Sequence, residues 1–388
     1  MPLHLRRFLS RASSSALAAS LALVAIGCGD DEEQPPPKEN PPVTEACAKI
    51  DFSEAASYPT GLSPVSSAVG DMDGDLKADL LVANNSDATV TFLKGLGNGG
   101  FQSQGSLPAG EGPVAVAMGD LNADGSLDAV VANQLSNDIS VIFGGPVPSN
   151  VGSYSAGEDP IWIATTDLDG DTDVDVVVAH GVGTTVGVLL GDGAGTLAPA
   201  VDVDVGGVPK SVALADFDAD GLGDIAVTRE GNVLAVLRGT GGGGFADAVT
   251  YTTGTAPYSL IAGEFSRDGV LDIAVANGNS DNLSVFLGAG DGTFAEGITY
   301  AIGKDPKNIA AGDINCDGVT DLAVANYLDN TVTVLLGGGT PFLGTFEYPT
   351  QLGPRSVAVA DFNGDKLADV AATNAAEGTV TILVNTSQ

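Results

Sequence analysis

A short acidic loop recurs seven times in this 388-residue chain, and its side chains are spaced like the ligands of a cation. The copies start at Asp71, Asp120, Asp167, Asp216, Glu264, Asp313 and Asp361, which are 47 to 49 residues apart. In each copy, oxygen-bearing side chains stand at positions 1, 3, 5 and 9. Oxygen ligands of this kind suit hard cations, and so many carboxylates favour Ca2+. The loops therefore predict a series of calcium sites.

Six of the seven loops carry Asp at positions 1, 5 and 9 and Asp or Asn at position 3. Their candidate ligands are Asp71, Asp73, Asp75 and Asp79; Asp120, Asn122, Asp124 and Asp128; Asp167, Asp169, Asp171 and Asp175; Asp216, Asp218, Asp220 and Asp224; Asp313, Asn315, Asp317 and Asp321; and Asp361, Asn363, Asp365 and Asp369. The fifth loop departs from this pattern, with Glu264, Ser266, Asp268 and Asp272, so its site is in doubt. Plain Asp-rich turns are the alternative. An EF-hand is excluded, because strands flank the loop and no Glu stands at position 12.

The elements around each loop are four apolar stretches of strand length. The first follows a Pro placed seven residues before the loop, and the second follows the loop, as in 80–83. The third alternates in polarity, as in 331–336, and the fourth opens with Phe, as in 245–251. Four antiparallel strands in about 48 residues are typical of a propeller blade. The expected fold is all-β, a seven-bladed β-propeller of four-stranded antiparallel blades spanning residues 49–388.

The two ends of the repeat region predict how the ring closes. The chain stops after the third strand of the seventh repeat, and residues 52–61 match residues 294–303 in the spacing of Phe, Tyr and Gly. The N-terminal segment should therefore be the outer strand of the last blade and should pair with residues 379–384. Such pairing would leave fewer free strand edges.

The loop pattern, with the Phe-Gly and Gly-x-x-Pro marks around it, resembles the FG-GAP (VCBS) repeats of integrin α-subunit propellers. It is also similar to a fungal seven-bladed lectin built from the same repeat. The resemblance covers residues 50–388. It implies a seven-bladed propeller with Ca2+ held between the first and second strands of most blades, by the residues named above. It implies no particular ligand.

Composition and motifs narrow the class of function. The net charge is −35, and 24 of the 50 acidic residues are candidate ligands. Nucleic acid is an unsuitable partner, because no basic stripe exists to neutralise phosphates. No nucleophile elbow, Walker loop or paired cysteine motif occurs, and His180 stands where other repeats end a strand with Asn. We therefore expect no catalytic residues and no enzyme.

The N-terminus reads as an export signal. An apolar run at 16–26 follows Arg6 and Arg7 and is too short to span a membrane as a helix. The segment 24–28 resembles a bacterial lipobox, which implies a signal peptide at 1–27 and lipidation of Cys28. Residues 28–48 are acidic and Pro-rich and should form a tether. We expect a monomer, lipid-anchored at a bacterial outer membrane or cell surface; a periplasmic or secreted protein is the alternative. Whether Cys47 and Cys316 pair remains open.

One sector of the propeller face opposite the acidic loops is predicted to bind an anionic group. The residue after each turn Pro is aliphatic in blades 1 to 3 and polar or basic in blades 4 to 7, and one Trp lies nearby. The candidate ligand-binding residues are Trp162, Lys210, Arg229, Tyr258, Lys304, Lys307 and Arg355. Local ion pairs and a Trp that fills a packing gap are the alternative. The sequence thus favours a surface binding or adhesion module for a glycan or protein. A polysaccharide-active enzyme and a purely structural surface protein are the other hypotheses.

Overall fold

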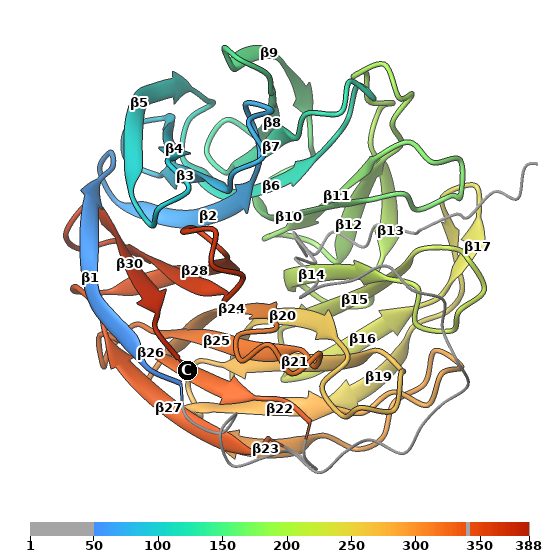
Figure 1. The fold of residues 1–388 in the computed structure, drawn as a ribbon. Helices are drawn as coiled ribbons and strands as arrows, with labels where there is room; N and C mark the ends of the chain where they lie inside the picture. Colours follow the sequence, from blue (N-terminus) through green and yellow to red (C-terminus); the bar gives the residue numbers. More distant parts are fainter. Residues whose placement is uncertain (1–49, 339–341, 388) are drawn as a thin grey trace, which may run out of the picture.

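Each of the seven repeats folds into one four-stranded antiparallel sheet, and the sheets stand around a common axis (Figure 1). The structure is a computed structural model and describes residues 50–338 and 342–387. The predictions that concern residues 1–49, among them the signal peptide, Cys28, the tether and Cys47, lie outside the described residues. The seven-bladed propeller predicted from the repeats is confirmed.

The blades are numbered 1 to 7 from the first inner strand. The inner strands all begin at the turn Pro: β2 (Pro64–Gly70), β6 (Pro113–Gly119), β10 (Pro160–Thr166), β14 (Pro209–Ala215), β20 (Pro257–Gly263), β24 (Pro306–Gly312) and β28 (Pro354–Ala360). The second strands all begin at the Asp of loop position 9: β3 (Asp79–Asn84), β7 (Asp128–Asn133), β11 (Asp175–His180), β15 (Asp224–Arg229), β21 (Asp272–Asn277), β25 (Asp321–Asn326) and β29 (Asp369–Asn374). The third strands are β4 (Thr89–Gly95), β8 (Asp138–Phe143), β12 (Thr185–Leu189), β16 (Val233–Leu237), β22 (Asn282–Phe286), β26 (Thr331–Leu336) and β30 (Thr379–Asn385). The outer strands are β5 (Phe101–Pro108), β9 (Ser149–Ser155), β13 (Val201–Asp204), β19 (Val249–Thr252), β23 (Ile298–Ala301), β27 (Gly344–Pro349) and β1 (Phe52–Pro59).

The first strand in the chain closes the ring. Strand β1 pairs antiparallel with β30, with Phe52 opposite Asn385 and Pro59 opposite Thr379. The last blade therefore has the strand order β1-β30-β29-β28, and Figure 1 shows the N-terminal strand beside the C-terminal one. The closure predicted from the sequence is confirmed.

The hydrophobic core is divided among the seven interfaces between neighbouring blades. Each interface holds one cluster of buried side chains drawn from two adjacent blades. The cluster between the last blade and the first joins Val380 and Ile382 to Leu80 and Val82, all 0% exposed. Each buried aliphatic side chain of this size contributes about 1.5–3 kcal/mol. Ring closure therefore buries one further apolar interface, besides pairing an edge strand.

The outer strand of the middle blades starts later than the sequence suggested. In blade 4 the strand begins at Val249, whereas Phe245 lies in a small extra hairpin, β17 (Gly239–Gly241) with β18 (Gly244–Phe245). In blade 5, Phe294 forms only an isolated bridge with Gly288. The Phe294 ring packs edge-on against Phe217 of the neighbouring blade, 5.3 Å between centroids. Because the ring is anchored in the core between blades, the backbone there leaves the sheet edge.

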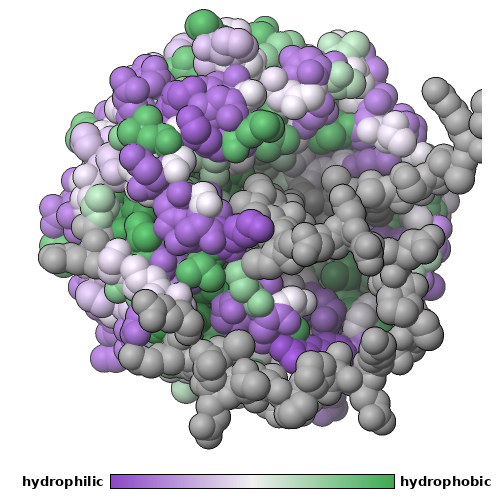
Figure 2. Space-filling model, viewed as in Figure 1, coloured by the Kyte–Doolittle hydropathy of each residue, from purple (hydrophilic) through white to green (hydrophobic). Residues whose placement is uncertain are grey.

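On the face seen in Figure 2, hydrophilic and hydrophobic residues are interspersed over the described surface. Within residues 50–338 and 342–387, no helix is long and apolar enough to cross a membrane.

Candidate functional site

The backbone of every acidic loop is wound around its first carboxylate. Positions 4 and 6 have positive φ in all seven copies, for example 80° at Gly74 and 64° at Leu76. This conformation turns successive N–H groups inward. Asp71 accepts hydrogen bonds from the backbone N–H of Gly74 at 2.8 Å, of Asp75 at 3.0 Å and of Leu76 at 2.7 Å. Position 1 is thus fixed by its own loop, and its charge is directed toward the centre of that loop.

The aspartate at position 9 joins the acidic loop to the end of the third strand in each blade, an arrangement here called the clasp. The sequence analysis missed this role. Asp79 is fully buried; its Oδ2 accepts from the N–H of Met72 at 3.1 Å and its Oδ1 from the N–H of Gly95 at 2.8 Å. The same pair of hydrogen bonds recurs in the other six blades. A Cβ at Gly95 would collide with the carbonyl oxygen of Ala78. The repeated Gly after the third strand is the signal that could have revealed this clasp.

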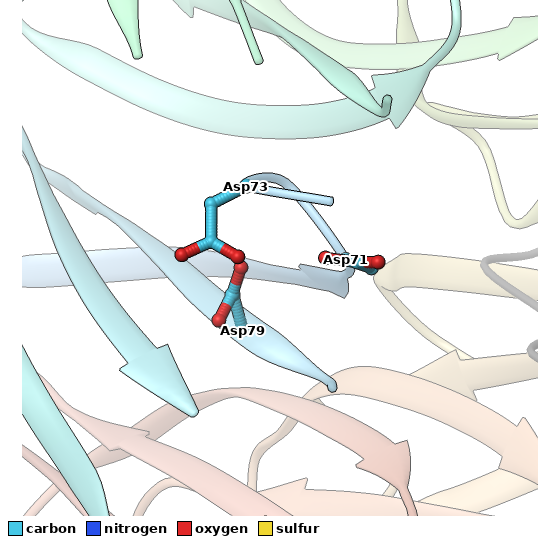
Figure 3. Close-up of side chains that lie close together, drawn as sticks. All are labelled: Asp71, Asp73 and Asp79. Atoms are coloured by element: carbon cyan, nitrogen blue, oxygen red, sulfur yellow. The ribbon is translucent and has the colours of Figure 1, made fainter. Parts of the chain in front are cut away.

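In each of three loops, the carboxylates lie close enough together to bind one ion. In blades 1, 3 and 4, oxygens from positions 1, 3 and 9 lie within 4.8 Å of one another. Figure 3 shows this group in blade 1, where Asp73 and Asp79 come together beside Asp71. The position 3 atoms Asp73 Oδ1, Asp169 Oδ1 and Asp218 Oδ1 are buried and have no hydrogen-bond partner. Buried oxygens without a donor are costly, so these atoms fit a bound cation.

The loops with Asn at position 3 are arranged differently. The Nδ2 of Asn363 donates to Asp365 Oδ2 at 2.9 Å, and the Nδ2 of Asn315 donates to Asp317 Oδ2 at 3.2 Å. The amide thus binds the position 5 carboxylate, which relieves part of the repulsion within the loop. Blades 6 and 7 therefore bring the predicted ligands into contact but do not form the carboxylate triad.

The electrostatics of position 9 favour a cation in the same place. Burial raises the pKa of Asp79, Asp175 and Asp224 to about 6, that of Asp369 to about 7 and that of Asp321 to about 8. The two backbone N–H groups lower these pKa values, and neighbouring loop carboxylates raise them again. A divalent cation would stabilise the charged forms. The residues present therefore fit a hard divalent metal ion.

Basic side chains from the end of the third strand reach into the loops of blades 1 and 4, which the sequence analysis did not anticipate. Lys94 contacts Asp73 and lies 2.9 Å from Asp75 Oδ2 in blade 1. Arg238, at the equivalent position of blade 4, lies 3.4 Å from Asp218. Their shared place directly before the Gly that follows the third strand was the available signal.

The fifth loop keeps its shape without a carboxylate at position 3. Glu264 Oε1 accepts from the N–H of Ser266 at 2.9 Å and of Asp268 at 3.2 Å. The Arg267 guanidinium points into the loop of blade 6, with its Nη2 2.6 Å from Asp317 Oδ2. Asp272 still forms the position 9 clasp. Blade 5 therefore supplies a cation to its neighbour, while its own loop offers a serine in place of a carboxylate at position 3.

A pocket of about 360 Å³ opens at the other end of the inner strands. Each inner strand begins at this end with its turn Pro and finishes at the acidic loop, so about 20 Å of strand separates the two faces. Five of the seven predicted ligand-binding residues line the pocket: Trp162, Lys210, Tyr258, Lys307 and Arg355. It is also lined by Asn85, Gln134 and Asn308, which the sequence analysis did not single out.

Arg229 and Lys304, the other two predicted residues, are not among the residues that line the pocket. Arg229 donates to the carbonyl of Val205 in the preceding turn. His180 has an equivalent role in blade 3, where its Nε2 donates to the carbonyl of Ala156 at 2.6 Å. Both residues hold the preceding turn in place, as Asn84 does in blade 1, where its Oδ1 accepts from the N–H of Gly61 at 3.0 Å. The expectation that His180 is structural agrees with these contacts.

The pocket's cations differ in their partners. Lys307 pairs with Asp305 at 2.7 Å, and Lys210 pairs with Glu230 at 3.0 Å. Local ion pairing, the alternative considered from the sequence, therefore holds for both lysines. Arg355 has no carboxylate partner among the described residues; its Nη2 donates to the Tyr258 hydroxyl at 2.8 Å.

The remaining cysteine of the described chain lies in the loop of blade 6. Cys316 Sγ donates to the carbonyl of Lys366 at 3.0 Å. Because Cys47 lies outside the described residues, the pairing of the two thiols stays open.

Comparison with known structures supports the same architecture. BBS1N in complex with ARL6DN is 14% identical with a TM-score of 0.64, over 87% of this chain and 98% of that one. A streptogramin B lyase is 13% identical with a TM-score of 0.61, over 88% and 100%. A catalytically inactive virginiamycin B lyase from Staphylococcus aureus with quinupristin is 16% identical with a TM-score of 0.56, over 87% and 99%. At these identities the likeness extends to the fold alone.

No curated protein sequence matches the chain. The family model for the FG-GAP-like repeat, in contrast, matches residues 71–131, 167–227, 216–275, 265–324 and 313–372. Each matched segment begins in or beside an acidic loop and runs into the second strand of the next blade. The chain therefore belongs to the FG-GAP-like repeat family.

Proposed function

We propose that this protein is an exported, lipid-anchored, calcium-binding propeller. It would bind a glycan or protein in the pocket at the mouth of the ring, which is the end where the inner strands begin. The observation that carries the proposal is the convergence of five predicted ligand-binding side chains in one pocket, on the face opposite the acidic loops. Pockets of this size with a few convergent polar groups are the usual form of a ligand site.

Calcium would serve the scaffold. Positions 1, 3 and 9 of blades 1, 3 and 4 offer carboxylates within reach of one ion, with a buried oxygen that lacks a donor. Oxygen-only ligands and extracellular calcium at about millimolar concentration suit such sites. The bound ion would supply the positive charge that crowded loop carboxylates need, and so would hold the inner and second strands of a blade together.

Binding is favoured over catalysis by the composition of the pocket. The described lining contains no His, Asp or Glu, the side chains that most often act as general bases near neutral pH. Export and anchoring are supported by the sequence of residues 1–48. The ring is complete within one chain, which supports a monomer.

The test is a binding screen of the calcium-loaded protein against a glycan panel and surface proteins, with and without EGTA. The triple variant Lys210→Ala, Lys307→Ala and Arg355→Ala should lose binding while its calcium affinity and melting temperature stay near those of the wild type. The variant Lys304→Ala removes positive charge from a residue that does not line the pocket and should bind normally. Undiminished binding by the folded triple variant would move the site elsewhere. A wild type that binds nothing would favour a purely structural protein.

A further inference from the structure

We propose, on the basis of the function given above, that the pocket recognises an acidic sugar: a pyranose ring whose carboxylate is bound by Arg355 and whose face stacks on Trp162.

The first step is the state of Arg355. Lys307 and Lys210 already have carboxylate partners, at 2.7 Å and 3.0 Å. Arg355 contacts an uncharged hydroxyl instead, and no acidic side chain of the described chain pairs with it. An anion that binds Arg355 would therefore displace no existing ion pair. In a protein of net charge −35, an uncompensated guanidinium inside a pocket is a specific anion receptor.

The second step is the arrangement around that guanidinium. Arg355 belongs to blade 7 and Tyr258 to blade 5, so their hydrogen bond of 2.8 Å reaches past blade 6. The Nζ of Lys307, in blade 6, lies over the Tyr258 ring, 4.6 Å from its centroid. Because the Tyr258 oxygen accepts from Arg355, its proton can be donated to a ligand. A guanidinium and a hydroxyl joined by this hydrogen bond lie close enough together to bind the two oxygens of one carboxylate.

The third step is the opposite wall. Trp162 belongs to blade 3, which is three or four blades from Arg355 in either direction around the ring, and it lines the same pocket. Its side chain is only partly buried. Trp162 packs against the buried cluster between blades 3 and 4, and the part of the indole left exposed suits the apolar face of a sugar ring. A protein Asp or Glu side chain bound at Arg355 would leave this wall without a partner.

The fourth step is the set of amides between the two walls. Asn308 Oδ1 accepts from the backbone N–H of Val357 at 3.0 Å, which fixes the amide and leaves its NH2 group for a ligand. Gln134 is fixed in the opposite sense, because its Nε2 donates to Asp159 at 2.8 Å and its carbonyl oxygen remains as an acceptor. One oriented donor and one oriented acceptor match sugar hydroxyls, which both donate and accept.

The experiment uses the full calcium-loaded protein and three probes that differ at one group: tri-galacturonate, its methyl ester and neutral galactotriose. Esterification keeps the rings and removes the charge. Binding is measured by calorimetry and by the emission of Trp162, which is the only Trp of the chain. The acid should bind about 10- to 100-fold more tightly than the ester and should change the Trp emission. Arg355→Ala should abolish the preference for the acid, and Arg355→Lys should restore only part of it. Glu347→Gln, on the exposed outer strand β27, should behave like the wild type.

Equal affinity for the acid and the ester would overturn the inference, and so would binding that leaves the Trp emission unchanged. Binding of an acidic peptide but of none of the three sugars would also overturn it, while the proposed function would stand. If the protein binds neither the probes nor any member of the wider panel, the proposed function itself fails. An acid preference that survives in Arg355→Ala would refute the assignment of the carboxylate to Arg355.

Discussion

Replacing Lys94 by Met should make blade 1 less stable without calcium and a better calcium site. The ammonium of Lys94 contacts Asp73 and lies 2.9 Å from Asp75, and its side chain is 27% exposed. Two unit charges about 4 Å apart interact with roughly 4 kcal/mol at an effective dielectric constant of about 20. Solvent screening and the fixing of a long side chain reduce this, so we expect a net loss of about 1–2 kcal/mol in the metal-free protein.

The stability that the metal-free Lys94→Met variant loses should appear as tighter calcium binding by that variant. If calcium displaces the ammonium, the variant loses stability only in its metal-free state, and its affinity should rise about 5- to 30-fold. At about 2.1 cal/mol/K per residue, the metal-free melting temperature should fall by about 1–3 °C. Calcium titration of the metal-free protein should show one site of the set shifted to tighter binding.

Two further variants make the argument refutable. Lys77→Met removes a more exposed lysine that pairs only with Asp75, at 3.2 Å, and should change both quantities little. Leu190→Lys places a cation in blade 3 at the position equivalent to Lys94 and should weaken calcium binding there. Unchanged or weaker calcium affinity in folded Lys94→Met would show that the lysine does not compete for the site.

Three other perturbations follow from the same structure. In metal-free protein the melting temperature should rise as the pH falls from about 8 to about 5.5. The folded-state pKa values of about 6 to 8 at position 9 lie above the unfolded value of 3.8, so stability is lost as pH rises through them. Calcium-loaded protein should respond in the opposite sense, because protons displace the metal; parallel pH profiles in scanning calorimetry would contradict this. Gly95→Ala should lower the free energy of unfolding, measured by urea titration, by more than about 2 kcal/mol, because the new methyl group meets the carbonyl of Ala78. Gly152→Ala is the control and should cost little, because the space around that position is open. Deletion of residues 46–60 should expose the edge of β30 and cause aggregation in size-exclusion chromatography, so a stable monomeric deletion mutant would argue against the closing role of β1.

The strands and loops that recur once in every repeat could be predicted from the sequence. The turn Pro, the acidic loop and the alternating third strand recur in phase, and each matches a strand boundary of the structure. The match between residues 52–61 and 294–303 located the closing strand, because an outer strand is recognised by the side chains it buries. The late start of β19 and β23 was missed, because it depends on Phe rings packing on a neighbouring blade.

The candidate sites were predictable to a similar degree. Spacing identified candidate ligands that the structure brings together in blades 1, 3 and 4, yet the sequence does not show that Asp79 binds two backbone N–H groups of its own blade. The sector of the ring that lines the pocket was predicted from one position in each blade, the residue after the turn Pro. The hydrogen bond between Arg355 and Tyr258 joins residues 97 apart, so only the three-dimensional ring reveals it. Long side chains such as Lys94 and Arg267 were missed, because their reach into a loop depends on rotamers and on the neighbouring blade.

The antiparallel closing strand determines how the ring would respond to mechanical load. The Phe52 end of β1 lies beside Asn385, whose N–H binds Asp369 on the acidic-loop face, and the Pro59 end lies at the mouth. A pull between the chain preceding Ile50 and a ligand in the pocket would therefore run along β1. Such a force shears β1 against β30 and loads their hydrogen bonds together, instead of peeling them apart one by one. Because forced unfolding is governed by the unfolding rate, the position of this strand would make a tethered propeller resistant to tension from its own ligand.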